Sequence, residues 1–354
     1  MRERGGIRIG PMGKTRLSMA MLRISALAVL LTLPSCSTVE FYRQAAAGQI
    51  EIIRKARPNE VVAADPATSA HLRERLAEVE EMRRFASEHL ALPGDESYGR
   101  YADLGRKHVV WVVYAAPEFS VEPKTWFYPF VGSLDYRGYF NEADAEKLRD
   151  ELKAEALDVH LGGVDAYSTL GVFHDPLLNT FIDYPDIHLA ETIFHELTHR
   201  RYFRWGDTEF NECLANVVAE EGVRRWLATE GRVADLRKYE GLLVRRREFY
   251  QEIERSKNEL ETLYASGLPA ESMRERKQVV FARLKQRFRE LHDRWGGRGL
   301  EGWMEEDINN GHIVSLKIYA ARMPEIRDLL ERCGGDFDRL FKSLSSHHDT
   351  TPAP

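Results

Sequence analysis

The stretch Asp186–Phe203, DIHLAETIFHELTHRRYF, contains an arrangement that is hard to explain as ordinary packing. Its centre is an H-E-x-x-H motif formed by His195, Glu196 and His199. Residues four apart lie on one face of a helix, so both imidazoles can bind one ion, and zinc fits that geometry. Glu196 would lie beside the ion, where its carboxylate can take a proton from an activated water. A helix is predicted here, because apolar residues recur at helical spacing without Gly or Pro between Ile187 and Trp205.

A zinc site needs a third protein ligand, and the residues after the motif narrow the choice. The longer motif H-E-x-x-H-x-x-G-x-x-H is excluded, because Tyr202 and Trp205 occupy the positions of its Gly and last His. The segment Phe210–Asn216 is predicted to begin a second helix, on which Glu212 shares a face with small residues that permit close helix packing. We therefore predict Glu212 as the third ligand of one zinc ion. The competing carboxylates, which lack this small-residue face, are Glu209, Glu220 and Glu221.

Two neighbours of Glu212 have predicted roles in the second helix. Asn216, one turn further on, can accept the outer N–H of a ligating imidazole and so fix its tautomer. Cys213 points about 100° away from Glu212 on a helix, so we interpret it as a packed thiol. Two other interpretations of the motif stay open. A purely structural zinc site would not require Glu196, and without a metal both histidines would be hydrogen-bonded core residues.

The two predicted metal helices are accompanied by other motifs. The sequence H-E-L-T-H is followed by F-N-E-x-x-A, and three further segments are Y-R-G-Y-F (Tyr136–Phe140), A-Y-S-T-L-G (Ala166–Gly171) and D-P-L-L (Asp175–Leu178). Together they resemble a bacterial family of zinc-dependent lipoproteins described as predicted aminopeptidases, over about residues 36–324. More distantly, the Asn-Glu-x-x-x-Asn run resembles the Asn-Glu-x-x-x-Asp motif of thermolysin-like peptidases, although the gap between His199 and Glu212 is shorter than in thermolysin.

This resemblance implies a zinc-dependent metallopeptidase with peptides as substrates and Glu196 as the general base. We expect it to be an aminopeptidase. It also implies Tyr319 as the donor to the oxyanion, because Asn309-Asn310 followed by an apolar run and Tyr resembles the family's C-terminal motif; His312 is the alternative. One of the Gly- and Tyr-containing segments is expected to pair with substrate backbone. The sequence lacks a G-x-M-E-N motif, which supplies the acidic anchor for the amino terminus in some zinc aminopeptidases. The competing function is a zinc-stabilised envelope lipoprotein that acts as a binding or assembly factor without catalysis.

The composition is that of a folded chain with mixed charge. Its 354 residues are 43% hydrophobic, which is enough for one large or two small cores. The net charge of -6, with both signs spread along the chain, argues against nucleic acid as a partner. If Cys36 is acylated, as predicted below, only Cys213 and Cys333 remain. Two distant cysteines do not indicate a disulfide framework.

The first 35 residues have the pattern of a lipoprotein signal peptide. Several Arg and Lys residues precede an apolar run at 24–33, which is too short to span a membrane and ends in Leu33-Pro34-Ser35-Cys36. We predict cleavage before Cys36 and acylation of its thiol, although Pro34 is unusual in such a box. The true start is Met19 or Met21 if the long basic region is not translated. The resemblance to lipoproteins with Ser after the Cys implies the outer membrane of the bacterial envelope, facing the periplasm.

We expect an α+β fold, mostly α, in which a small mixed sheet precedes the metal helices and a long antiparallel helical hairpin follows them. The resemblance implies a thermolysin-like core. The expected segments are the signal peptide (1–35), an N-terminal helical segment (36–100), a metallopeptidase core with the HELTH and NECLA helices (101–231), a helical hairpin (232–296), C-terminal helices that complete the active site (297–343) and a loose tail (344–354).

Local patterns predict the individual elements outside the metal helices. The hairpin is broken at Ser266–Pro269. Residues 58–66 are expected to form a turn-rich joint. Predicted helices cover 41–57, 71–89, 142–156 with Asn141 as the cap, and 308–330 with an interruption at Pro324. Predicted strands cover 109–116, 125–131, 158–164 and 180–183.

Overall fold

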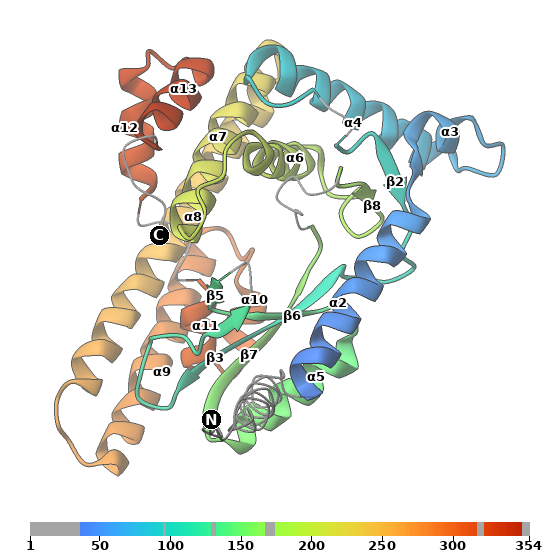
Figure 1. Cartoon of the computed structure of the whole chain (residues 1–354). Coiled ribbons are helices and arrows are strands. Elements are labelled where there is room, and N and C mark those ends of the chain that lie inside the picture. The colour runs from blue at the N-terminus through green and yellow to red at the C-terminus, as the bar shows by residue number, and fades with distance from the viewer. Residues whose placement is uncertain (1–35, 95–96, 129–131, 167–173, 317–321, 349–354) are drawn as a thin grey trace, which may run out of the picture. The chain divides into compact units, whose positions relative to one another are not determined.

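The structure is a computed structural model that describes residues 36–94, 97–128, 132–166, 174–316 and 322–348 (Figure 1). The chain divides into a short unit that ends at Ala47 and a large unit from Gly48 to Pro354. The fold is α+β and mostly α, which confirms the predicted class. Tyr319 and residues 167–171 of the A-Y-S-T-L-G segment lie outside the described residues.

Helices predominate up to α4, most of the strands lie between β2 and β8 with α5 among them, and the described chain after β8 is helical. The helices are α2 (Cys36–Lys55), α3 (Asn59–Ala64), α4 (Ala70–His89), α5 (Glu142–Ala154), α6 (Asp186–Arg201), α7 (Thr208–Thr229), α8 (Val233–Tyr264), α9 (Ala270–Arg294), α10 (Glu301–Glu305), α11 (Asn310–Ser315), α12 (Met323–Arg332) and α13 (Phe337–His348). The strands are β1 (Arg57–Pro58), β2 (Arg100–Ala102), β3 (Val110–Pro117), β4 (Trp126–Tyr128), β5 (Gly132–Leu134), β6 (Arg137–Tyr139), β7 (Leu157–Val164) and β8 (Leu177–Leu178).

The described strands form three small sheets where the sequence predicted one. Their orders are β1-β2-β8, β6-β3-β7 and β4-β5. In the second sheet β3 is central and antiparallel to both neighbours, and Tyr114 pairs with His160 across the β3–β7 ladder. The predicted strand at 180–183 is wrong. The N–H groups of Phe181 and Ile182 both bond to the carbonyl of Leu178, which closes a turn directly after β8.

Helices α6 and α7 carry the predicted metal ligands and are called the metal helices below. They lie side by side in the core of the large unit (Figure 1). Apolar residues of α6 such as Leu189 and Phe194 are fully buried, and Asp207 caps the start of α7, because its side chain accepts the N–H of Phe210. The close packing depends on Gly222 of α7, because a Cβ there would lie 2.7 Å from Leu90 and 3.0 Å from Phe194. The small-residue face of α7 therefore meets α6, as its sequence indicated.

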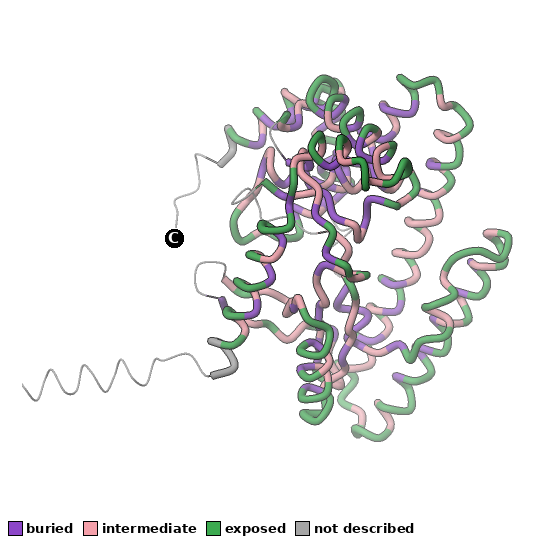
Figure 2. Tube along the Cα trace, turned by 90° about the vertical axis from the view of Figure 1, so that its right-hand side faces the viewer, coloured by how far each residue is buried: buried purple, intermediate pink, exposed green. Residues whose placement is uncertain are grey.

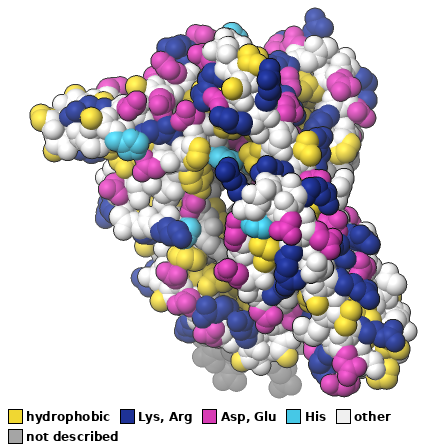
Figure 3. Space-filling view, turned by 180° about the vertical axis from the view of Figure 1, so that it is seen from behind, with side chains coloured by type: hydrophobic (Ala, Val, Ile, Leu, Met, Phe, Trp, Pro, Cys, Tyr) yellow, Lys and Arg dark blue, Asp and Glu magenta, His cyan; other side chains and the backbone are white. Residues whose placement is uncertain are grey.

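The predicted hairpin is present as α8 and α9, with a turn at Ser266–Pro269 between them. The two helices pack through a second apolar cluster, which also includes Val121, Ile308 and Ile313. Buried positions alternate with exposed ones along the helices in Figure 2. Lys and Arg are interspersed with Asp and Glu on the face that Figure 3 shows. No helix among the described residues combines the length and hydrophobicity that are needed to cross a bilayer.

Three of the predicted C-terminal and N-terminal details are wrong. The helix at 308–330 is divided, since α11 ends at Ser315 and α12 begins at Met323, with Pro324 in its first turn, where a missing N–H costs nothing. The tail predicted to be loose from residue 344 begins as helix, because Leu344 is buried in the main core and α13 continues to His348. The joint at 58–66 contains the short helix α3, which buries Val62.

Candidate metal centre

Facing residues of α6 and α7 form a polar ladder. Helical spacing of four places Glu191, His195 and His199 on one face of α6, and the same spacing places Glu212, Asn216 and Glu220 on one face of α7. His195 and His199 meet Glu212, and His195 also meets Asn216. The structure therefore brings together the four residues that the sequence predicted for the metal and its support.

The side chains of three residues in this ladder, His195, His199 and Glu212, converge closely enough to hold one metal ion. The Nε2 atoms of His195 and His199 lie 3.2 Å apart. Glu212 places one carboxylate oxygen 3.3 Å from Nε2 of His195 and the other 3.4 Å from Nε2 of His199. Around a tetrahedral zinc with bonds of about 2.0–2.1 Å, neighbouring ligand atoms lie about 3.3 Å apart. The three distances join the two ring nitrogens and both oxygens of Glu212, and each is close to this spacing between ligand atoms.

The tautomer of His195 also suits a metal ligand. Its Nδ1 lies 3.1 Å from Oδ1 of Asn216, and an amide oxygen can only accept, so Nδ1 carries the proton and donates it. When Nε2 gives up its proton, its lone pair can then bind an ion. His199 is buried, and its Nδ1 has no hydrogen-bond partner within the described part of the chain.

Burial and the charges of Glu212 and of the two histidines set the electrostatics of the centre. Burial raises the pKa of Glu196, whose Oε2 is enclosed and has no described partner. Burial would also lower the pKa of His195, but its hydrogen bond to Glu212 and the charge of that carboxylate raise it to about 9. Conversely, although burial opposes ionisation, both histidines lower the pKa of Glu212. Positive charge is therefore stabilised where the three ligand atoms meet.

A second group of histidines and a carboxylate, His160, Glu306 and His312, fits a metal less well. Nδ1 of His312 accepts the N–H of Asn309 at 3.2 Å, so the ring proton lies on Nε2, which donates to Glu306 at 3.0 Å. A metal on Nε2 would force the proton onto Nδ1, where it would face that N–H. Burial lowers the pKa of His160 and of His312 to about 4, so both rings are neutral at pH 7. This group is a hydrogen-bonded cluster.

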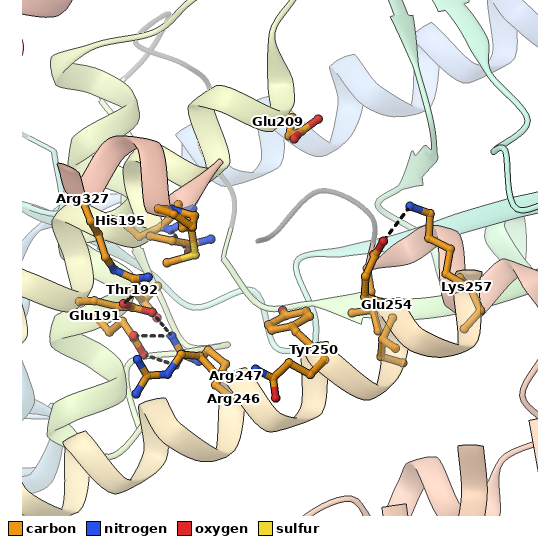
Figure 4. Close-up of a pocket in the computed structure, with 18 of the residues that line it drawn as sticks. Glu191, Thr192, His195, Glu209, Arg246, Arg247, Tyr250, Glu254, Lys257 and Arg327 are labelled. Carbon is orange, nitrogen blue, oxygen red and sulfur yellow. Dashed lines mark hydrogen bonds and ion pairs between the residues drawn. The ribbon is translucent and has the colours of Figure 1, made fainter. Parts of the chain in front are cut away.

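We call His195, His199 and Glu212 the metal cluster, because they are the candidate ligands of one ion. A cavity of about 860 Å³ opens beside this cluster (Figure 4). His195, Glu196 and Asn216 line it from the metal helices, and residues of α8 between Arg246 and Lys257 line it from the hairpin. Its volume lies within the range of sites for small ligands and short peptides. The hairpin thus forms a wall of the cleft, a role for which its sequence gave no signal.

Next to the metal cluster, partly buried ion pairs join the four helices α6, α7, α8 and α12. Arg246 of α8 binds both carboxylate oxygens of Glu191 on α6, at 2.8 and 2.9 Å, and approaches Glu220 of α7 at 3.5 Å. Arg327 of α12 binds Glu220 at 2.5 Å, and the hydroxyl of Tyr239 donates to Glu191. The labelled side chains in Figure 4 show Arg246 and Arg327 approaching Glu191 and its neighbours from different helices. This network holds the hairpin against the metal helices.

Two tyrosines near the cluster were missed as functional candidates. Tyr114 of β3 and Tyr136, directly before β6, have ring centroids 5.7 Å apart. Burial raises the pKa of both hydroxyls, and the negative charge of Glu212 adds to this effect. Tyr136 also lines a cavity of about 300 Å³ with Gly206–Glu209 at the start of α7. The only sequence signal was the position of Tyr136 in the Y-R-G-Y-F motif.

The fold and the cluster define a candidate metal-dependent hydrolase centre on two paired helices. The chain belongs to the family described as "Putative aminopeptidase", which matches residues 40–353. The resemblance seen in the sequence motifs is thereby confirmed at the level of the family. Searches of curated proteins and of solved structures found no match.

Proposed function

We propose that this chain is a zinc-dependent peptidase, in which His195, His199 and Glu212 hold one zinc ion. The observation that carries the proposal is the convergence of His195, His199 and Glu212, whose nearest ligand atoms lie 3.2–3.4 Å apart, with Glu196 beside them. The family's description favours peptides as substrates and aminopeptidase action. The remaining features of the centre support the same reaction.

Zinc, when bound, supplies a Lewis acid that polarises the scissile carbonyl and makes water more acidic. Glu196 accepts a proton from the attacking water as the water oxygen forms a bond to the carbonyl carbon, and the carbonyl π electrons move to the oxygen. The C–N bond then breaks, and the proton passes from Glu196 to the leaving amine. Asn216 keeps the ring of His195 in the tautomer that leaves Nε2 available.

The oxygen that becomes negative requires a donor, and described hydroxyls offer one. Tyr136 lies close enough to Glu212 for the charges to interact, and neither its hydroxyl nor that of Tyr114 bonds to a described residue. We propose Tyr136 as the donor, with Tyr114 packed against its ring. Tyr319, which the resemblance implied, stays a prediction, and His312 is instead held by Glu306.

Aminopeptidase action needs an acidic group for the free amino terminus of the substrate. Glu209 lines the cavity beside His195, and it forms no hydrogen bond or ion pair with any described residue. We propose it as that group. Peptides with an acetylated amino terminus should then be cleaved much more slowly than free ones, and equal rates would indicate endopeptidase action.

The zinc proposal is tested by metal analysis coupled to hydrolysis of free peptides with and without a chelator. We expect one zinc per chain, loss of hydrolysis on chelation and recovery when zinc is restored. His199→Ala should abolish tight zinc binding. Retention of a full equivalent of zinc by that variant would place the site elsewhere.

We also propose that Cys36 carries acyl chains that hold the protein at a bacterial membrane, outside the cytoplasm and at the outer membrane facing the periplasm. The support is the basic segment, the short apolar run and the Leu33–Cys36 box. Labelling with a fatty acid analogue should be lost in Cys36→Ser. Unchanged labelling of that variant would refute the anchor.

A further inference from the structure

A second, arginine-lined cavity adjoins the main cavity, with which it shares two lining residues. This second cavity has a volume of about 540 Å³ and shares Arg247 and Arg327 with the first. Its other walls come from α7 beyond Val217 and from residues 330–335 at the end of α12. The wall that the two cavities share is therefore positively charged.

Most of the arginines in this region already have partners. Arg327 pairs with Glu220, and Arg224 pairs with Glu240 at 2.7 Å. Arg225 pairs with Glu221 at 2.9 Å and donates to the carbonyl of Gly335. These guanidinium groups are held by the protein itself, so they are not the residues most available to a ligand.

Arg247 is the exception among the cations of the cavity wall. It extends from the same helix as Arg246 (Figure 4), and it has neither an ion pair nor a hydrogen bond with any of the described residues. The other cations that line the main cavity, Arg246, Lys257 and Arg327, all pair with glutamates. Arg247 is thus an uncompensated guanidinium at the junction of the two cavities, and a guanidinium binds a carboxylate through two parallel hydrogen bonds.

The helix geometry gives the distance along α7 between the metal cluster and the contact of Arg246, the residue before Arg247. The neighbouring Arg246 approaches Glu220, eight residues after Glu212 on α7. At 1.5 Å per residue, this separation is about 12 Å along the helix axis. An extended peptide advances about 3.3 Å per residue, so roughly three or four residues cover it.

We propose that Arg247 binds the terminal carboxylate of a short peptide whose other end lies at the metal cluster. This proposal rests on the proposed function and adds a substrate class, namely peptides of about three to five residues with a free C-terminus. An acidic side chain at the same position offers the same chemistry, and the test separates the two.

The test measures binding to the full chain with zinc and Glu196→Gln, which prevents turnover. The ligands are tri-, tetra- and penta-alanine, each as the acid and as the amide, together with an amide in which Glu is the last residue. We expect calorimetry to show that at least one acid binds about tenfold more tightly than its amide. Arg247→Gln should remove that difference. Arg276→Gln should keep it, because Arg276 on α9 is exposed, as Arg247 is, but lines neither cavity.

Equal affinities for acid and amide, absence of binding by every acid, or a difference that survives Arg247→Gln would overturn the proposal. Tight binding of the Glu-terminated amide alone would assign the site to an acidic side chain and overturn the terminal carboxylate. Hydrolysis of the same peptides by the unsubstituted chain is measured in parallel. Cleavage without discrimination between acid and amide would refute only the proposed role of Arg247. Binding without cleavage would refute the proposed peptidase function.

Discussion

The direction of one hydrogen bond distinguishes the two histidine clusters. In His195 the Nδ1 proton points to Asn216, which leaves Nε2 for a metal. In His312 the Nδ1 atom instead accepts a hydrogen bond from the backbone N–H of Asn309. The sequence could predict the first cluster, since His195, Glu196, His199 and Glu212 are fixed by helical spacing within two neighbouring helices. It could not predict the second cluster, which joins residues from β7 and from the residues around α11.

Asn216→Ala should weaken zinc binding by about 10- to 100-fold, because the ring of His195 loses the acceptor that orients it. Asn216→Asp keeps an acceptor oxygen and is the matched control. Competition with a chromophoric chelator measures both affinities. An unchanged affinity in the Ala variant would show that Asn216 does not support the metal.

Tyr136→Phe should lower kcat by about 10²-fold with little change in KM or zinc content, because a donor to the oxyanion acts in the transition state. Tyr101→Phe, in the separate sheet that contains β2, serves as the control. Steady-state kinetics with a free peptide decides the matter. Should Tyr136→Phe keep full activity while Tyr319→Phe loses it, the assignment implied by the family resemblance would hold instead.

His160 should make the protein less stable in acid. Burial lowers the pKa of His160 from 6.5 to about 4, so the unfolded chain binds a proton at a higher pH than the folded chain does. The free energy of unfolding is therefore unaffected by this group above about pH 6.5 and decreases as the pH falls toward 4. His160→Gln should reduce this loss by about 1–3 kcal/mol. Denaturant unfolding at pH 7 and pH 4.5 compares the two proteins. Parallel pH profiles would mean that His160 titrates normally.

At the scale of elements, long periodic patterns were predicted well and short ones poorly. Helices α4, α8 and α9 and strand β3 carry enough apolar periodicity to define themselves. The turn at Thr180–Asp183 does not, because it is closed by bonds to the carbonyl of Leu178 and not by a strand partner. The boundary at Pro324 was misplaced because proline can begin a helix as well as interrupt one.

The packing of α6 on α7 gives a matched pair of glycine substitutions. Gly222→Ala should destabilise the protein by about 1–2 kcal/mol, because its Cβ would overlap buried Leu90 and Phe194 and outweigh the gain in helix propensity. Gly241→Ala, on α8 with open space around it, should stabilise by about 0.5–1 kcal/mol. Denaturation midpoints report both. Equal stabilisation by the two substitutions would contradict the close helix approach.

At the scale of the whole molecule, the sequence predicted which segments exist but not which of them share a cleft. The hairpin was recognisable from residues 232–296 alone. Its contribution to the cavity depends on Arg246 reaching Glu191 across 55 residues of sequence, and such a pairing leaves no local pattern. The same limit hid Tyr114, whose place beside Tyr136 follows from sheet register.

The central claim is that Glu196 is the general base at a zinc ion held by His195, His199 and Glu212. The most direct measurement is the zinc content and the peptide hydrolysis rate of Glu196→Gln beside the unsubstituted protein. Glutamine is close in size and keeps all three ligands, but it cannot accept the proton from water. We predict one zinc per chain in both proteins and a rate that falls by about 10²- to 10⁴-fold in the variant. Equal rates at full zinc occupancy would contradict the account.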